Sequence, residues 1–166
     1  MYPTSYYIAL GTNVGNYRNN LSRAVFELSK IGNISKLANI YKSKPYGYLK
    51  QNYFYNTMVS LKSEIHPSDL IKKIHLIERK LHKNKRIING PRKIDLDIIF
   101  WDKKIFKNNN LVIPHPRLQE RDFVLCPLLD IAPFFKDPVS KLSVKELIKN
   151  LKDHYVIKKL NYRNLF

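Results

Sequence analysis

The chain has 166 residues, 44% of them hydrophobic, so it is long enough for one domain that buries about two thirds of its unfolded surface. Its single cysteine, Cys126, excludes an internal disulfide and indicates a reducing compartment, and no apolar run is long enough to span a membrane. The net charge of +17 would ordinarily suggest a nucleic-acid partner, but the 22 lysines and 8 arginines are scattered, which favours a solvated, lysine-rich surface.

Residues 5–10 are predicted to form a first strand. The turn-forming residues of segment 11–15 follow it, and we interpret them as architecture because they match no phosphate-loop pattern. A helix comes next and ends before Gly32. Its buried face is predicted from apolar residues at helical spacing, namely Leu21, Ala24, Val25 and Leu28.

A second strand is predicted from about Ser35 to Tyr41, and the proline-containing segment 43–47 should be a loop. A third strand, from about Phe54 to Lys62, should pair with the second in antiparallel fashion. A second helix opens at Pro67 and ends at the basic loop 82–89. Its apolar positions are Leu70, Ile71, Ile74, Ile77 and Leu81.

The fourth strand belongs to the stretch 90–102, GPRKIDLDIIFWD, which carries two carboxylates in an otherwise apolar run. Alternate residues of a strand share a face, so Asp95 and Asp97 should point one way. The opposite face is predicted to hold Ile94, Leu96, Ile98 and Phe100. Two like charges about 7 Å apart repel, and Mg²⁺, which prefers oxygen ligands, would compensate them.

A turn at Gly90 and Pro91 directly precedes this strand and should bring Arg92 close to the two acids. A guanidinium beside a metal-binding carboxylate pair can hold the same anion as the metal. The pattern therefore indicates phosphoryl chemistry on a nucleotide.

The rest of the chain is predicted to be mostly helical. A short hairpin follows Asp102, residues 108–110 form a turn, and helices are expected over 123–131 and 143–151. The order β-α-β-β-α-β is that of a ferredoxin-like core, an α+β fold with an antiparallel sheet and helices on one face, here with a C-terminal helical extension. No linker divides the chain, so residues 1–166 should form a single domain.

Five segments in order carry a resemblance to a known family: IALGTNVGN at 8–16, SKPYG at 43–47, FYNTMV at 54–59, GPRKIDLDI at 90–98 and PHPRLQERDFVLCPLLDIAP at 114–133. With these segments the chain resembles the 6-hydroxymethyl-7,8-dihydropterin pyrophosphokinases of folate biosynthesis over nearly its whole length. The resemblance implies the same α+β core. It also implies transfer of a pyrophosphoryl group from ATP to the hydroxymethyl oxygen of the pterin, with release of AMP.

The same resemblance implies site residues. Asp95 and Asp97 would hold two Mg²⁺ ions, and the catalytic groups would be these aspartates with Arg92, Lys83 and Lys85. ATP would be bound by His75, Glu78, Arg92, Ile98, His115 and Arg121. The pterin would be bound by Ser43, Pro45, Tyr46, Gly47, Phe54, Asn56, Asp95 and Phe123.

The chain departs from the family pattern at two places. Segment 82–85 reads HKNK where relatives carry two arginines before the GPR turn, and the loop is one residue shorter. Pro116 follows His115 and removes a backbone donor there. The resemblance implies that loop 82–89 closes over ATP and pterin as a lid.

Two other functions compete with this prediction. A different two-metal nucleotidyltransferase would release pyrophosphate, but its acids usually follow a Gly-Ser turn that this chain lacks. A basic RNA-binding ferredoxin-like module would use aromatics such as Tyr53, Phe54 and Tyr55, but the signature of such modules is missing. We therefore expect a cytoplasmic monomer whose partners are ATP and the pterin, with no nucleic-acid or membrane partner.

Overall fold

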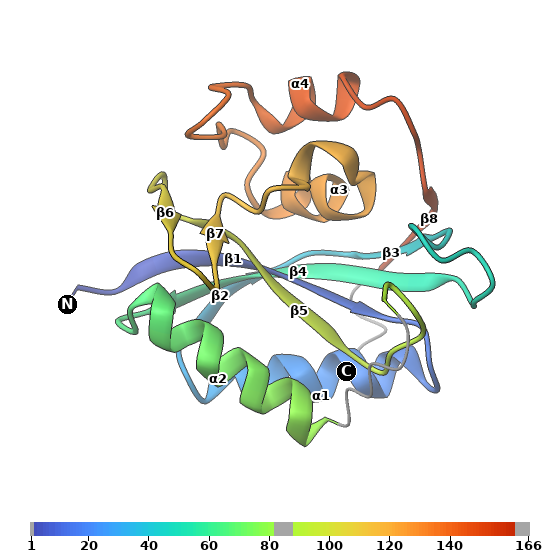
Figure 1. The fold of residues 1–166 in the computed structure, drawn as a ribbon, viewed down its shortest axis with the longest axis horizontal. Coiled ribbons are helices and arrows are strands. Elements are labelled where there is room, and N and C mark those ends of the chain that lie inside the picture. The colour runs from blue at the N-terminus through green and yellow to red at the C-terminus, as the bar shows by residue number, and fades with distance from the viewer. Residues whose placement is uncertain (1, 82–87, 162–166) are drawn as a thin grey trace.

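The computed structural model describes residues 2–81 and 88–161 of the chain. Within these residues the main sheet has six strands in the order β5-β1-β4-β3-β8, with β2 also paired to β4 (Figure 1). Every pair is antiparallel. The strands are β1 (Thr4–Thr12), β2 (Asn33–Leu37), β3 (Ile40–Ser43), β4 (Phe54–Ser63), β5 (Asp95–Trp101) and β8 (Val156–Leu160).

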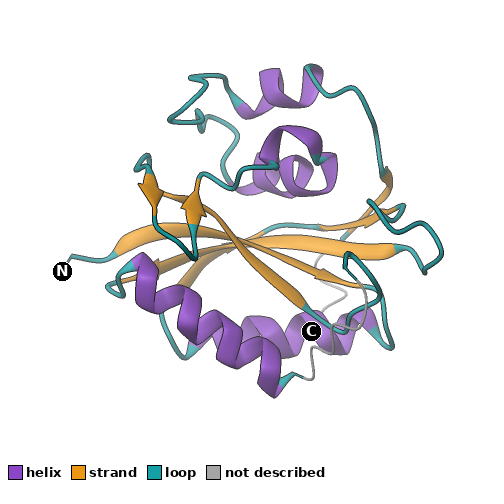
Figure 2. Ribbon diagram, in the orientation of Figure 1, coloured by secondary structure: helices purple, strands orange, loops and turns teal. Residues whose placement is uncertain are grey.

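Helices cover both faces of the sheet. Figures 1 and 2 show α1 (Tyr17–Ser29) and α2 (Pro67–Lys80) on one face, with α3 (Asp122–Ile131) and α4 (Val144–Lys149) on the other. The predicted α+β class is confirmed, and both helices of the predicted core lie on the same face as expected. The C-terminal helices form a second layer that the sequence did not place. The ferredoxin-like arrangement itself stays a prediction.

A small hairpin connects β5 to the C-terminal helices. It consists of β6 (Phe106–Lys107) and β7 (Val112–Ile113), and a short 3-10 helix, η1 (Leu118–Glu120), follows it. Between the two strands, the Asn108 side chain accepts hydrogen bonds from the backbone N–H groups of Asn110 and Leu111. The predicted turn at 108–110 is therefore confirmed.

The predicted second strand, Ser35–Tyr41, is wrong in one respect, because it is split into β2 and β3. The chain breaks at Asn39, whose backbone and side-chain nitrogens both donate to the Asp130 carboxylate of α3, at 3.1 and 3.0 Å. A backbone N–H that donates to a side-chain carboxylate is no longer available for a hydrogen bond between strands. The split therefore comes from a helix about 90 residues further along the chain.

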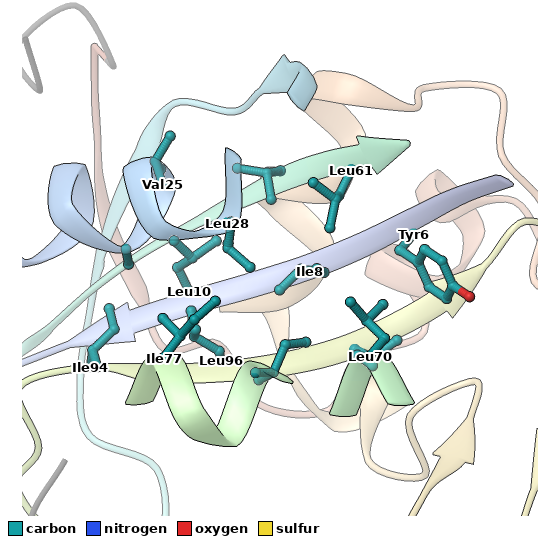
Figure 3. Packing of buried hydrophobic residues seen from close by; sticks show 14 of the residues in the cluster. Tyr6, Ile8, Leu10, Val25, Leu28, Leu61, Leu70, Ile77, Ile94 and Leu96 are labelled. Atoms are coloured by element: carbon teal, nitrogen blue, oxygen red, sulfur yellow. The ribbon is translucent and has the colours of Figure 1, made fainter. Parts of the chain in front are cut away.

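One hydrophobic core lies between the sheet and helices α1 and α2. Figure 3 shows Leu28 of α1 and Ile77 of α2 packed with Leu10 of β1 and Leu96 of β5. The predicted helical faces are buried as expected, except that Ile71 is only partly buried. Burial of this kind contributes about 25 cal/mol for each Å² of apolar surface removed from water, so this core holds the sheet and the two helices together.

A second core lies between the sheet and helices α3 and α4. The pairing of β1 with β5 shifts register, since Tyr7 faces Phe100 whereas Ile8 faces Ile98. Ile99 is thus an extra residue, and the alternation of side chains reverses after it. The sequence placed Phe100 on the same face as Leu96 and Ile98, but that prediction is wrong because this bulge turns Phe100 into the second core.

Strand β8 was not predicted from the sequence, and it pairs with β3 at the edge of the sheet.

Among the residues that the structure describes, none of the helices has both the length and the apolar character needed to cross a membrane.

Gly32 lies where a side chain has no room. A Cβ atom there would lie 2.6 Å from the Lys62 carbonyl oxygen and 3.0 Å from Leu61 Cδ1. We expect Gly32→Ala to lower the free energy of unfolding by about 1–3 kcal/mol, because backbone atoms must move to relieve the overlap. Denaturant unfolding measures this, with Asn33→Ala at the exposed neighbouring position as the control. Equal stability of the two variants would contradict the expectation.

Candidate active site

The two aspartates of β5 lie beside the central strand β1. Asp95 pairs with Gly11 and Asp97 with Ala9, so both acids project between small residues. A Cβ atom on Gly11 would lie 3.1 Å from the side-chain oxygen of Asn56 on β4. The small residues of β1 therefore keep the sheet surface open between the acids and Asn56.

A pocket opens at this position, on the face of the sheet that α3 covers. Its walls come from β1, β4, β5, the segment after β3, the GPR turn and the start of α3. The lining residues are Ala9, Leu10, Gly11, Ser43, Lys44, Tyr46, Phe54, Asn56, Asn89, Arg92, Asp95, Asp97, Arg121, Phe123 and Val124.

Most of the site residues expected from the sequence meet in this pocket. They are Ser43, Tyr46, Phe54, Asn56, Arg92, Asp95, Asp97, Arg121 and Phe123. Lys83 and Lys85 lie outside the described residues, as does most of the expected lid. Pro45 lies in an adjoining hollow beside Leu49 and Tyr155.

Arg92 is held by two sets of contacts. Its backbone N–H donates to the Asn13 side chain at 2.9 Å, and its carbonyl accepts from the Asn13 N–H at 3.1 Å. Its Nε lies 3.0 Å from Asp95 Oδ2, an ion pair without the alignment of a hydrogen bond. The guanidinium also lies 5.0 Å from the Phe54 ring centroid. These contacts place a cation at the first aspartate, as the sequence predicted.

Arg121 places a second cation near the other aspartate. Its Nη1 lies 3.9 Å from Asp97 Oδ2, and its guanidinium lies 5.2 and 5.9 Å from the ring centroids of Tyr46 and Phe123. Burial lowers the pKa of the Arg121 guanidinium, whereas the Asp97 carboxylate opposes this shift. Its Nε is buried and has no hydrogen-bond partner among residues 2–81 and 88–161. A buried donor of this kind favours an anion or another acceptor at the site.

His115 lies close to the same acid but is not among the lining residues. The His115 backbone N–H donates to the Ile99 carbonyl at 3.1 Å, and the ring Nδ1 accepts from the Arg117 backbone N–H at 3.2 Å. Burial lowers the pKa of the imidazole; Asp97 opposes this and Arg121 lowers the pKa further. At neutral pH the ring is therefore uncharged, with Nδ1 as the acceptor, so its proton lies on Nε2.

The opposite half of the pocket combines aromatic rings with a buried amide. Asn56 is 7% exposed, and its Nδ2 donates to Ser43 Oγ at 2.9 Å and to the Tyr41 carbonyl at 3.3 Å. These bonds fix the amide plane and leave Oδ1 on the side of Gly11. Phe54 and Phe123 line the same pocket and supply flat apolar surfaces. This half can hold a planar ring with polar edges.

The remaining expected residues lie away from the pocket lining. His75 is exposed on α2, and Ile98 is buried in the core beneath the sheet. Glu78 is 4% exposed, and its Oε1 accepts the Leu96 N–H at 2.9 Å, between the two aspartates along β5. Gly47 has a positive φ of 80°, and a Cβ there would lie 2.9 Å from the Asn89 side chain. Their predicted roles in binding stay predictions.

Several lining residues were missed by the sequence analysis. Asn89 has a positive φ of 55°, and its carbonyl accepts from Gln51 Nε2 at 2.7 Å. Gln51 Oε1 in turn accepts from Asn13 Nδ2 at 2.9 Å. Segment 11–15, interpreted as architecture, thus helps to position the loop that carries Arg92. The signal available in the sequence was the density of asparagine in these turns.

The acids fit a magnesium ion by their chemistry. Both provide only oxygen atoms, and Mg²⁺ is usually held by one or two carboxylates that are completed by water and substrate phosphates. No group of three or more His, Cys, Asp or Glu side chains that could hold a metal occurs within the described ranges. A substrate that brings its own oxygen ligands would complete such a site.

Comparison with known proteins gives consistent matches. A family model described as 7,8-dihydro-6-hydroxymethylpterin-pyrophosphokinase matches residues 7–133. The chain is 34% identical over 140 residues to the 2-amino-4-hydroxy-6-hydroxymethyldihydropteridine pyrophosphokinase of Aquifex aeolicus. This alignment covers 84% of this chain and 88% of that protein. It is 41% identical over 149 residues to the folic acid synthesis protein fol1 of Pneumocystis carinii. That alignment covers 89% of this chain and 20% of that protein.

Two further comparisons concern chain length and fold. The chain spans about a fifth of the length of the Pneumocystis carinii protein and 22% of the Dictyostelium discoideum folic acid synthesis protein FOL1. A crystal structure of wild-type Plasmodium falciparum HPPK-DHPS superposes with a TM-score of 0.69 at 17% identity, covering 89% of this chain and 44% of that chain. At that identity, the superposition supports the fold.

Proposed function

The chain belongs to the 7,8-dihydro-6-hydroxymethylpterin-pyrophosphokinase family, and we propose that it transfers a pyrophosphoryl group from ATP to 6-hydroxymethyl-7,8-dihydropterin in folate synthesis. The hydroxymethyl oxygen bonds to the β-phosphorus and loses its proton. The bond from that phosphorus to the oxygen shared with the α-phosphorus breaks, and AMP leaves. The observation that carries the proposal is one pocket lined by two carboxylates, two guanidiniums and two phenylalanine rings.

The acidic half of the pocket handles the phosphates. Asp95 and Asp97 would hold two Mg²⁺ ions, which would supply charge neutralisation for the phosphates. Arg92 and Arg121 bind the phosphates from either side of the acids, since each already lies against one carboxylate. His115, uncharged and with its proton on Nε2, donates a hydrogen bond to a phosphate oxygen. The residues act by positioning and charge, without a covalent intermediate.

The aromatic half binds the pterin. Phe54 and Phe123 stack on the two ring faces, and Asn56 and Ser43 bond to its polar edges together with the backbone of segment 45–47. Asp95 would contact the pterin in addition to holding Mg²⁺. Glu78, His75 and Ile98 are proposed to contribute to nucleotide binding, and Glu78 also accepts the Leu96 N–H of β5.

The test is a coupled measurement of both products. The protein is supplied with ATP, Mg²⁺ and 6-hydroxymethyl-7,8-dihydropterin, and AMP and pterin diphosphate are quantified together. We expect one AMP for each pterin consumed, with no free pyrophosphate. Release of pyrophosphate would indicate a nucleotidyltransferase, and no pterin-dependent product would overturn the proposal.

Phe123 tests the pterin half of the pocket. Phe123→Ala should weaken pterin binding by about 1–3 kcal/mol and leave nucleotide affinity nearly unchanged, because the ring contacts a planar substrate and makes no ion pair. Calorimetry with each ligand separately measures this. If both affinities fell together, Phe123 would serve the packing of the whole site.

The expected lid gives a second test, although Lys83 and Lys85 lie outside the described residues. A lysine ammonium is a hydrated point charge, whereas arginine grips two phosphate oxygens at once. The double variant Lys83→Arg, Lys85→Arg should leave nucleotide affinity within a few-fold and raise the rate of the chemical step. Single-turnover kinetics measures that rate. An unchanged or slower step would mean that these lysines do not occupy the positions of the family's arginines.

We also propose that residues 1–166 act as one monomeric domain in the cytoplasm. The single cysteine supports this proposal, because proteins of the reducing cytoplasm rarely contain disulfides. Burial raises the pKa of the Cys126 thiol to about 11, so the group stays protonated and unreactive at neutral pH. Size-exclusion chromatography with light scattering tests the oligomeric state.

A further inference from the structure

Asp122, at the start of α3, makes contacts that the proposed reaction does not use. Its side chain is buried, with the residue 2% exposed, and Oδ2 accepts backbone N–H bonds from Tyr155 at 2.7 Å and Val156 at 2.9 Å. Oδ1 is buried without a hydrogen-bond partner in the described part of the chain. A buried carboxylate is costly to desolvate, so its contribution to stability alone is a weak explanation for its presence.

The segment that Asp122 holds leads into the edge strand beside the pterin half of the pocket. The Tyr155 carbonyl accepts the Lys44 N–H at 2.8 Å, and Val156 pairs with Ser43 in the β3–β8 ladder. Ser43 and Lys44 both line the pocket. Residues 155 and 156 are therefore bonded on one side to α3 and on the other to the chain that forms the pocket wall.

Three aromatic rings from three segments meet at this point. The Tyr155 ring lies 5.5 Å from Tyr46 at 67° and 5.9 Å from Phe123 at 87°, both edge-on contacts. Tyr46 and Phe123 are themselves 6.1 Å apart. Tyr46 and Phe123 line the pocket, whereas Tyr155 lines the adjoining hollow beside Pro45. Tyr155 therefore supports the two pocket rings from outside.

From these contacts we infer that Asp122 and Tyr155 are positioning residues for the pterin: Asp122 anchors residues 155 and 156 at the start of the C-terminal strand, and the Tyr155 ring holds Tyr46 and Phe123 at their places in the pocket wall. This inference rests on the proposed function. Neither residue needs to touch the substrate. A ring that is set edge-on against two others restricts their rotation, so the planar substrate meets a preformed surface.

A purely structural role would give a different pattern, and Asp130 provides the matched control. It lies near the other end of α3 and ties that helix to the same two strands, through Tyr41 of β3 at 3.0 Å and Lys159 of β8 at 2.9 Å. It is absent from the pocket lining. Loss of Asp130 should therefore weaken the packing of α3 on these strands without disturbing Tyr46 and Phe123.

The experiment compares Tyr155→Ala, Tyr155→Phe, Asp122→Ala and Asp130→Ala with the wild-type chain. KM is measured for the pterin at saturating ATP and for ATP at saturating pterin, and thermal unfolding is followed for each variant. Tyr155→Ala should raise the pterin KM by about tenfold and leave the ATP KM within about twofold, in line with the strength of ring contacts. Tyr155→Phe keeps the ring and should retain the wild-type KM.

The two carboxylate variants complete the comparison. Asp122→Ala removes the acceptor of both N–H groups, so it should raise the pterin KM by about tenfold and leave the ATP KM within about twofold. Asp130→Ala should lower the melting temperature without raising the pterin KM. An unchanged pterin KM in Tyr155→Ala or Asp122→Ala, equal rises of both KM values, or the same rise in Asp130→Ala would each overturn the inference. Absence of pterin-dependent AMP in the wild-type chain would instead overturn the proposed function.

Discussion

Asp97→Ala is expected to lower turnover by on the order of a thousandfold or more, because a metal that neutralises transferring phosphates supplies several kcal/mol to the transition state. Asp95→Ala should act alike. Both carboxylates lie on β5 inside one pocket, and each lies beside one arginine. Loss of either would therefore remove a proposed metal ligand and also leave a guanidinium to pair with substrate in a different position.

The fold should survive these changes. Asp97 is 38% exposed in its side chain, and its ion pair with Arg121 spans 3.9 Å, so its contribution to stability is small. Circular dichroism and thermal unfolding check this alongside the assay. Asp102→Ala is the matched control, since Asp102 directly follows the same strand, lies outside the pocket and accepts the Ser5 N–H at 3.1 Å. Retained activity in Asp97→Ala would show that the aspartate pair holds no essential metal.

Arg121→Lys should lower the rate of the chemical step by about a hundredfold to a thousandfold and change ATP affinity much less. The substitution keeps one positive charge but loses the planar fork that can bind two phosphate oxygens, and arginines at such positions act mainly on the transition state. Arg121 also lies against Tyr46 and Phe123, and a lysine would loosen these ring contacts. Single-turnover kinetics at saturating substrates measures the step directly.

The control for this variant is Arg79→Lys, on the exposed surface of α2. It should leave the single-turnover rate unchanged. If Arg121→Lys lost ATP affinity and rate in equal proportion, the guanidinium would bind ground state and transition state alike. An unchanged rate would remove Arg121 from the proposed machinery.

The sequence predicted those parts of the fold that depend on local pattern. The spacing of apolar residues identified α1 and α2, and the alternation along β5 placed Asp95 and Asp97 on one face. The alternation failed at Phe100, because the bulge at Ile99 depends on how β1 bonds to β5. The predicted strand Ser35–Tyr41 was wrong at Asn39, where Asp130 from a distant helix interrupts it. Neither the pairing with β1 at the bulge nor the contact with Asp130 can be inferred from the residues of the strands themselves.

The site shows the same division. Residues carried by the motifs, such as Arg92 and Phe123, line the pocket that the motifs predicted. Asn89 was missed because its place depends on the Gln51 contact, and Asp122 because its partners belong to a strand that the sequence did not reveal. Contacts between residues so far apart in the sequence cannot be inferred from the local residue pattern.

Strand β8 also bears on how the folded protein behaves at high concentration. It lies at one end of the main strand order, and its central residues Ile157, Lys158 and Lys159 are exposed. An open strand edge is a template on which another chain can add a strand, and lysine at such an edge opposes that addition by charge repulsion. With a net charge of +17, two copies that approach edge to edge would repel strongly. The lysines of β8 therefore oppose aggregation through this edge, and added salt, which screens their charge, weakens that effect.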